Sequence, residues 1–117
     1  MSKFPVNTEE TSRRSDPDVM FAALLVIVLH FPASGSLKAK RAVLKQVRAR
    51  LRADLNVSVA EVGYQDLWQR CMLGIAIAAG SEIGARKVAQ QACKLIARDP
   101  RVELLSQHLE VVAPELG

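Results

Sequence analysis

Aromatic residues are scarce in this sequence of 117 residues, which contains three Phe, one Tyr and one Trp. Aliphatic side chains must therefore fill the interior, and a hydrophobic share of 50% is large enough to supply them. That share also excludes a wholly disordered chain. The length fits one domain whose core is large enough to fold alone.

Cysteine is nearly absent as well. Cys71 and Cys93 have neither a CxxC spacing nor a spacing typical of metal ligands, so we expect two small buried thiols in a reducing compartment. His30 and His108 have no Cys or second His at ligand spacing. We therefore expect no metal site and no cofactor.

No apolar run is long enough to cross a membrane. The run from Phe21 to Phe31 has only about half the length of a span. It lacks a charged segment immediately before it and a cleavage site after it, unlike a secretory signal. We expect a cytoplasmic protein without a membrane partner.

Acidic residues are missing from one long basic segment. Ser36 to Arg52 reads SLKAKRAVLKQVRARLR and contains seven Lys or Arg but no Asp or Glu. The net charge of the whole chain is only +4, so the rest of the chain is acidic on balance. This distribution predicts one localised surface that faces an anion, not a basic coat over the whole protein.

Apolar periodicity and turn residues divide the chain into a single domain at 19–113, a disordered tail at 1–18 and a short tail at 114–117. Ser36 and Ser81 are suitable N-caps for two helices, and Pro32 and Pro100 stop the elements that precede them. The expected elements are, in chain order, a strand over 19–31, a helix over 36–54, strands over 56–63 and 68–79, a helix over 82–98 and a strand over 102–112.

The order β-α-β-β-α-β predicts an α+β fold, the ferredoxin-like sandwich, in which a four-stranded antiparallel sheet has both helices on one face. Right-handed crossovers place the first and third strands at its centre. We expect these strand residues to face inward: Cys71, Leu73, Ile75 and Ile77 in the third strand, and Leu105, Leu109 and Val111 in the last.

Five basic residues form one row on the first helix. Steps of three and four residues place them beside its apolar face: Lys38, Arg41, Lys45, Arg48 and Arg52. Such a row suits a phosphate backbone, and five contacts would give a log–log salt slope of about −3.5 to −4.5. Lys40 and Arg50 flank the row, and Lys40 points closer to the apolar side, where its stem can extend along the core.

The alternative for this row is a solvated helix face whose long side chains shield the edge of the core. Solvated faces usually intersperse Glu and Asp, which gain i,i+4 pairs. Here Arg41 repels Lys45, and Arg48 repels Arg52. We therefore favour contact with a polyanion.

The start of this helix is a candidate anion site, since free N–H groups and the helix dipole favour a phosphate there. Gly35, Ser36 and Lys38 would form it. Gly-Ser caps are common, and neither a Walker nor a GxGxxG pattern accompanies this one, so a dedicated nucleotide site is disfavoured.

The segment EVGYQDLWQR gathers polar residues around a turn. A catalytic interpretation uses Glu61 or Asp66 as the base and Arg70 as an anion clamp. The alternative is structural: Gln65 and Asp66 bind turn amides, Trp68 covers the edge of the core, and Arg70 pairs with a carboxylate. Two carboxylates near a turn are a weak signal, so we favour the structural role and expect no enzyme.

Both faces of the first strand are apolar, although a sheet with helices on one side usually has a polar second face. Something should cover the second face: another subunit, the N-terminal tail or a different protein. A homodimer is our first expectation. The interface residues would be Leu24, Val26, Val28 and Met72. The face lacks the exposed aromatics with which RNA-binding sheets stack bases, so RNA would contact the helix instead.

Two segments, HFPASGSLKAKRAVLK and NVSVAEVGYQDLWQR, resemble the YlxP-like family of small uncharacterised bacterial proteins. The resemblance covers roughly residues 19–112 in the same element order and implies a ferredoxin-like fold. Members of the family often lie beside genes for transcription, translation initiation and small-subunit maturation, which implies a role with the ribosome or RNA. Ala39 and Tyr64 depart from the usual Glu and His, so we assign Tyr64 no role in proton transfer.

These observations favour a non-enzymatic RNA-binding accessory protein that acts on ribosomal RNA or the small subunit through the basic helix. A protein-interaction or dimerisation module that uses the apolar sheet face is the second hypothesis. A small enzyme or ligand sensor at Glu61–Arg70 is the third and the weakest.

Overall fold

The computed structural model describes residues 19–115. The tail expected over 1–18 and the last two residues of the C-terminal tail lie outside the described residues. The elements in chain order are β1 (Phe21–His30), α2 (Leu37–Asp54), β2 (Ser58–Gly63), β3 (Arg70–Ala79), α3 (Glu82–Ala97) and β4 (Glu103–Val112). The expected order is confirmed.

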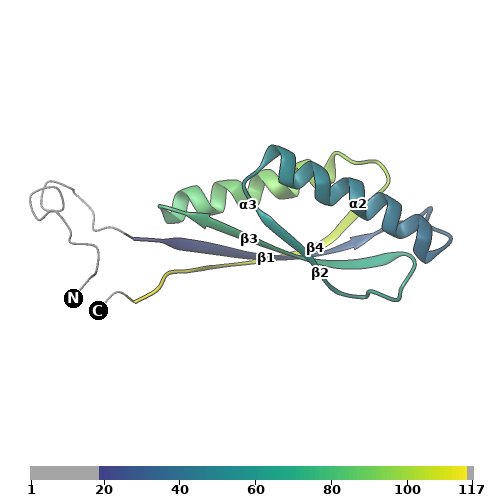
Figure 1. Ribbon diagram of the computed structural model, residues 1–117, viewed down its shortest axis with the longest axis horizontal. Helices are drawn as coiled ribbons and strands as arrows, with labels where there is room; N and C mark the ends of the chain where they lie inside the picture. Colours follow the sequence, from purple (N-terminus) through teal and green to yellow (C-terminus); the bar gives the residue numbers. More distant parts are fainter. Residues whose placement is uncertain (1–18, 116–117) are drawn as a thin grey trace, which may run out of the picture.

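The four strands form one antiparallel sheet in the order β2-β3-β1-β4, with β3 and β1 at its centre. Both helices lie on the same face of this sheet (Figure 1). The architecture is the predicted ferredoxin-like sandwich. The other face carries no element of residues 19–115, and we call it the open face.

The core lies between the helices and the sheet. Alternate residues of β1 and β3 supply it, because side chains along a strand point to opposite faces in turn. Ile27 and Leu73 are fully buried, and they meet Leu51 of α2 and Ile96 of α3 in one cluster. Both helices begin as expected: Ser36 Oγ accepts the Ala39 N–H at 3.0 Å, and Ser81 Oγ accepts the Gly84 N–H at 2.9 Å.

The prediction for β4 was wrong at Leu105. The register between β1 and β4 shifts at Val28/Leu29, so that Ser106 pairs with Val28 while Leu104 pairs with Leu29. Leu105 is the extra residue of this irregularity and is 48% exposed, whereas Leu104 packs against the core. A bulge breaks the two-residue alternation on which the prediction relied.

Candidate nucleic-acid interface

Helix α2 packs against the sheet through one apolar stripe. Leu44, Val47 and Leu51 are buried, at the three- and four-residue spacing of one helix face. This packing fixes the rotation of the helix and places the flank with the predicted basic row beside β2, where Arg52 reaches a β2 carbonyl.

Three members of the row are exposed and have no acidic partner. These are Lys38, Arg41 and Lys45. Within residues 19–115, no carboxylate oxygen lies within 4.0 Å of their side-chain nitrogens. No residue in the first turn of α2 is acidic either. The charge of this flank is therefore available to an external anion.

Arg48 and Arg52 are tied to the protein more closely. One terminal nitrogen of Arg52 donates to the Val59 carbonyl at 3.0 Å, although the residue remains exposed. Arg48 is half-buried, and its buried Nε has no hydrogen-bond partner among residues 19–115. Both are without a carboxylate partner in the described chain, so they add positive charge at the C-terminal part of the row.

Lys40 was wrongly included among the RNA-contacting residues. Its side chain is only 1% exposed, and its Nζ lies 3.0 Å from the Glu61 carboxylate. The same ammonium donates to the Tyr64 carbonyl at 2.8 Å. Lys40 therefore joins α2 to β2 and to the β2–β3 loop, and it cannot reach a polyanion on the surface.

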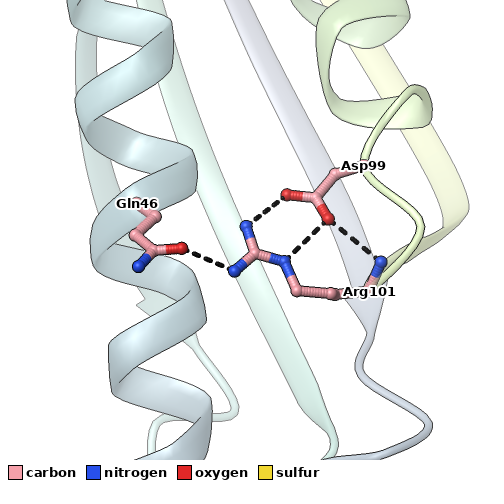
Figure 2. A network of polar contacts seen from close by, with 3 residues as sticks. All are labelled: Gln46, Asp99 and Arg101. Atoms are coloured by element: carbon pink, nitrogen blue, oxygen red, sulfur yellow. Dashed lines mark hydrogen bonds and ion pairs between the residues drawn. The ribbon is translucent and has the colours of Figure 1, made fainter.

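Arg50 lies on the opposite flank of α2, toward the end of α3. There Arg101 binds the Asp99 carboxylate through two side-chain nitrogens, at 2.9 and 2.7 Å, and also donates to Gln46 of α2 (Figure 2). The pKa of Asp99 is lowered to about 2, chiefly by the hydrogen bond from the Arg101 side chain, with a smaller contribution from the charge of Arg50. Arg50 thus belongs to a different surface from the row.

The candidate anion site at the helix start gains no support. The Ser36 hydroxyl already accepts the Ala39 N–H, and the Lys40 N–H donates to the Ser36 carbonyl at 3.1 Å. The second of these is the ordinary first bond of the helix, and the cap takes up one of the free N–H groups that an anion would use.

Of the residues in the catalytic interpretation, Glu61 and Arg70 do not converge, whereas Asp66 and Arg70 line one hollow. Glu61 pairs with Leu73 in the sheet register and faces the helices, whereas Arg70 pairs with His30 and lies on the open face. Cys71, also on the helix side, is fully buried, and its pKa is raised to about 12 by burial and by the nearby Glu61 charge. A thiol with so high a pKa is a poor nucleophile.

Three structural expectations for the β2–β3 loop were wrong. The Asp66 carboxylate accepts no hydrogen bond from a turn amide within residues 19–115. Trp68 does not cover the core, because it is 56% exposed. Arg70 has no carboxylate partner in the described chain, and its guanidinium lies 6.0 Å from the centroid of the Tyr64 ring. Trp68 was expected at the edge of the core, at the start of a strand; its position directly after the turn residues was the signal that it could lie outside.

The open face is apolar over its centre, as predicted. Leu24 is 43% exposed there, and Val26, Val28 and Met72 are half-buried beside it. The register places the large residues of β1 next to small residues of β3, with Leu24 opposite Ala76 and Val26 opposite Gly74. A hollow of roughly 350 Å³ lies over these small residues and is bordered by Val62.

Residues 19–115 contain neither a candidate metal site nor a helix that could span a membrane. They contain no group of three His, Cys, Asp or Glu side chains placed to hold a metal ion. Neither of their helices has the length and apolar character needed to cross a bilayer.

The chain is similar to proteins whose names describe no activity. Residues 22–109 match a family described as "Protein of unknown function (DUF503)". The chain is also 44% identical over 70 residues to a protein of Bacillus subtilis (strain 168) named "Uncharacterized protein YlxP". That alignment covers 60% of this chain and 76% of the Bacillus protein.

Proposed function

This chain belongs to the DUF503 family, as its local sequence indicated, and we propose that it is a non-enzymatic, cytoplasmic accessory protein that binds RNA. The contact surface is the basic row of α2: Lys38, Arg41 and Lys45, assisted by Arg48 and Arg52. One observation carries the proposal: this row is positively charged along its whole length and has no carboxylate partner within residues 19–115.

The row has the dimensions of a phosphate-binding surface. From Lys38 to Arg52 it extends about 21 Å along the helix, at a rise of about 1.5 Å per residue. Its charges are arranged at the cost of repulsion between Arg41 and Lys45, about 0.2–0.5 kcal/mol for such a pair. A polyanion removes that repulsion when it binds.

The proposed target is structured ribosomal RNA, and in particular RNA of the small subunit. This choice rests on the resemblance and on what it implies about neighbouring genes. Backbone contacts position a protein on RNA without reading its sequence. We therefore expect recognition of the shape of folded RNA, with modest sequence preference along α2.

A gel shift with structured ribosomal RNA at low salt tests the proposal. We expect binding by the native protein and a loss of at least ten-fold in the variant K38E/R41E/K45E, which replaces only exposed residues. The matched control is K87E/K94E/R98E, which makes the same change in net charge on α3 and its C-cap. Absence of binding at low salt, or equal losses in both variants, would refute the proposal.

A second candidate function is self-association or protein interaction through the open face. Its support is the exposed Leu24 beside the hollow over Gly74. In a two-fold dimer whose axis runs along the central strands, the large β1 residues of each copy would lie over the small β3 residues of the other. Light scattering separates a dimer from a monomer, and partners that survive nuclease treatment of a lysate would favour protein interaction over RNA binding.

A further inference from the structure

Trp68 is the single tryptophan of the chain, and it is more than half exposed in the loop between β2 and β3. It borders a hollow of roughly 450 Å³ that is also lined by His30, Asp66, Leu67, Gln69 and Arg70. A large aromatic ring beside an open hollow leaves apolar surface in water that folding alone does not require. A ligand with a flat ring would cover it.

The backbone on both sides of Trp68 is anchored by hydrogen bonds. On one side, Lys40 of α2 donates to the Tyr64 carbonyl, and the Leu67 N–H donates to that same carbonyl at 3.1 Å. On the other side, the Phe31 N–H donates to the Gln69 carbonyl at 2.9 Å. The Gln69 side-chain amide donates to the Pro32 and Ser34 carbonyls. Because the loop is anchored on both sides of Trp68, it loses less conformational entropy when a ligand binds.

The chemistry around the hollow matches an unpaired nucleobase. The ring face of Trp68 offers stacking, and the guanidinium of Arg70 offers charge to the adjoining phosphate. The exposed Asp66 carboxylate accepts no hydrogen bond through its side chain from residues 19–115. A carboxylate accepts from the amino and imino groups of a base, which guanine presents together and uracil does not.

The hollow lies at the same end of the molecule as the start of the basic row, although no residue of α2 lines it. Lys40 contacts the loop directly, and Lys38 and Arg41 are its neighbours on α2. Figure 1 shows the β2–β3 loop and the first turns of α2 at the same end of the molecule. RNA whose backbone follows α2 toward its N-terminus therefore reaches the end of the molecule that carries the β2–β3 loop.

We propose that Trp68, Asp66 and Arg70 form a binding site for one unpaired base, preferentially guanine, at the N-terminal end of the basic row. The site rests on the proposed RNA-binding function and adds base recognition to it. The protein then selects a junction, with structured RNA along α2 and a single-stranded extension at the loop.

Trp68 fluorescence tests the site, since no other tryptophan contributes to the signal. The probes are a blunt RNA hairpin and the same hairpin with a single-stranded tail of guanosines or of uridines. We expect the guanosine-tailed hairpin to quench the fluorescence and to bind more tightly than the blunt one. Trp68→Ala should weaken that binding roughly five- to one-hundred-fold and leave binding of the blunt hairpin unchanged.

Three variants sharpen the result. Trp68→Phe retains an aromatic ring, so it should keep part of the additional affinity for the guanosine-tailed hairpin over the blunt one. Asp66→Ala should remove the preference for guanosine over uridine while stacking remains. Ile83→Ala, at another exposed apolar residue on α3, is the control and should change nothing.

The outcomes separate the two proposals. Binding that weakens with salt, combined with no fluorescence change and no effect of Trp68→Ala, overturns the base site and leaves the function of α2 intact. Quenching that depends on protein concentration in the absence of RNA assigns Trp68 to self-association and also overturns the base site. No binding of any hairpin at low salt overturns both.

Discussion

Lys40 and Arg41 are adjacent in the sequence, carry the same charge and have opposite environments. Lys40 is buried against Glu61 and the Tyr64 carbonyl, whereas Arg41 is exposed without an acidic partner in the described chain. Helical spacing placed Lys40 nearer the apolar side, but its partners come from another strand and another loop. A buried charge that has partners holds elements together, and removing one partner leaves the other unpaired.

Replacement of Lys40 by Met should therefore destabilise the protein by about 3 kcal/mol, since the Glu61 carboxylate would lose its cation. Urea unfolding measures this change. Lys38→Met, at an exposed position on the same helix, should change stability by less than roughly 0.5 kcal/mol. Equal effects of the two substitutions would show that Lys40 is not paired as described.

Asp99 should make the free energy of unfolding depend on pH in the acidic range. Its pKa is lowered from 3.8 to about 2 chiefly by the Arg101 side chain, so the folded state binds a proton less readily than the unfolded state. The contribution, on the order of 1–2 kcal/mol, is present above pH 4 and is lost as the pH falls from 4 through 2. In urea unfolding, Arg101→Gln should be less stable than the native protein at pH 6, and the difference should shrink toward pH 2. A constant difference would contradict this assignment.

At the scale of elements, α2 combines a stabilising apolar stripe with a row of mutually repelling charges. Lys45→Glu should raise the stability of the protein by roughly 0.5 kcal/mol, because the introduced carboxylate would face Arg41 and Arg48, each one turn away. The same substitution should weaken RNA binding. Thermal unfolding and a binding titration on one preparation check both results. A variant that loses stability and keeps its affinity would contradict the functional role of the row.

All six elements follow from local signals. Ser36 and Ser81 act as N-caps, and the alternation from Cys71 to Ile77 correctly predicted the buried side of β3. Leu105 escaped prediction because a bulge is a property of two paired strands. One strand read alone shows only its own alternation, which a single extra residue reverses.

For the molecule as a whole, the two candidate interaction surfaces lie on opposite sides. The basic row lies on α2, which covers one face of the sheet (Figure 1), whereas the side chains of the apolar patch point to the open face. Their functions should therefore be separable by mutation, and one molecule has room to use both.

Leu24→Ser should reduce self-association without affecting RNA binding, because Leu24 is 43% exposed on the open face. Sedimentation across a concentration series measures association, and Ile83→Ser on α3 is the matched apolar-to-polar control. A monomeric native protein at all concentrations would remove the dimer from consideration.

The surface properties that sequence reasoning missed all depend on the tertiary fold. Glu61 meets Lys40 only because β2 packs under α2, which turns one predicted RNA contact into an internal ion pair. Trp68 is exposed because anchors from Lys40 and Phe31 hold its loop away from the core. The basic row itself follows from helical spacing, since that property belongs to a single element.

The salt dependence of RNA binding tests the central claim most directly. With structured ribosomal RNA, the logarithm of the affinity should fall with the logarithm of salt concentration at a slope between about −2, for three phosphate contacts, and about −4.5, for five. The variant K38E/R41E/K45E should lose most of both the slope and the affinity. A slope near zero, or a variant that matches the native protein, would contradict the account.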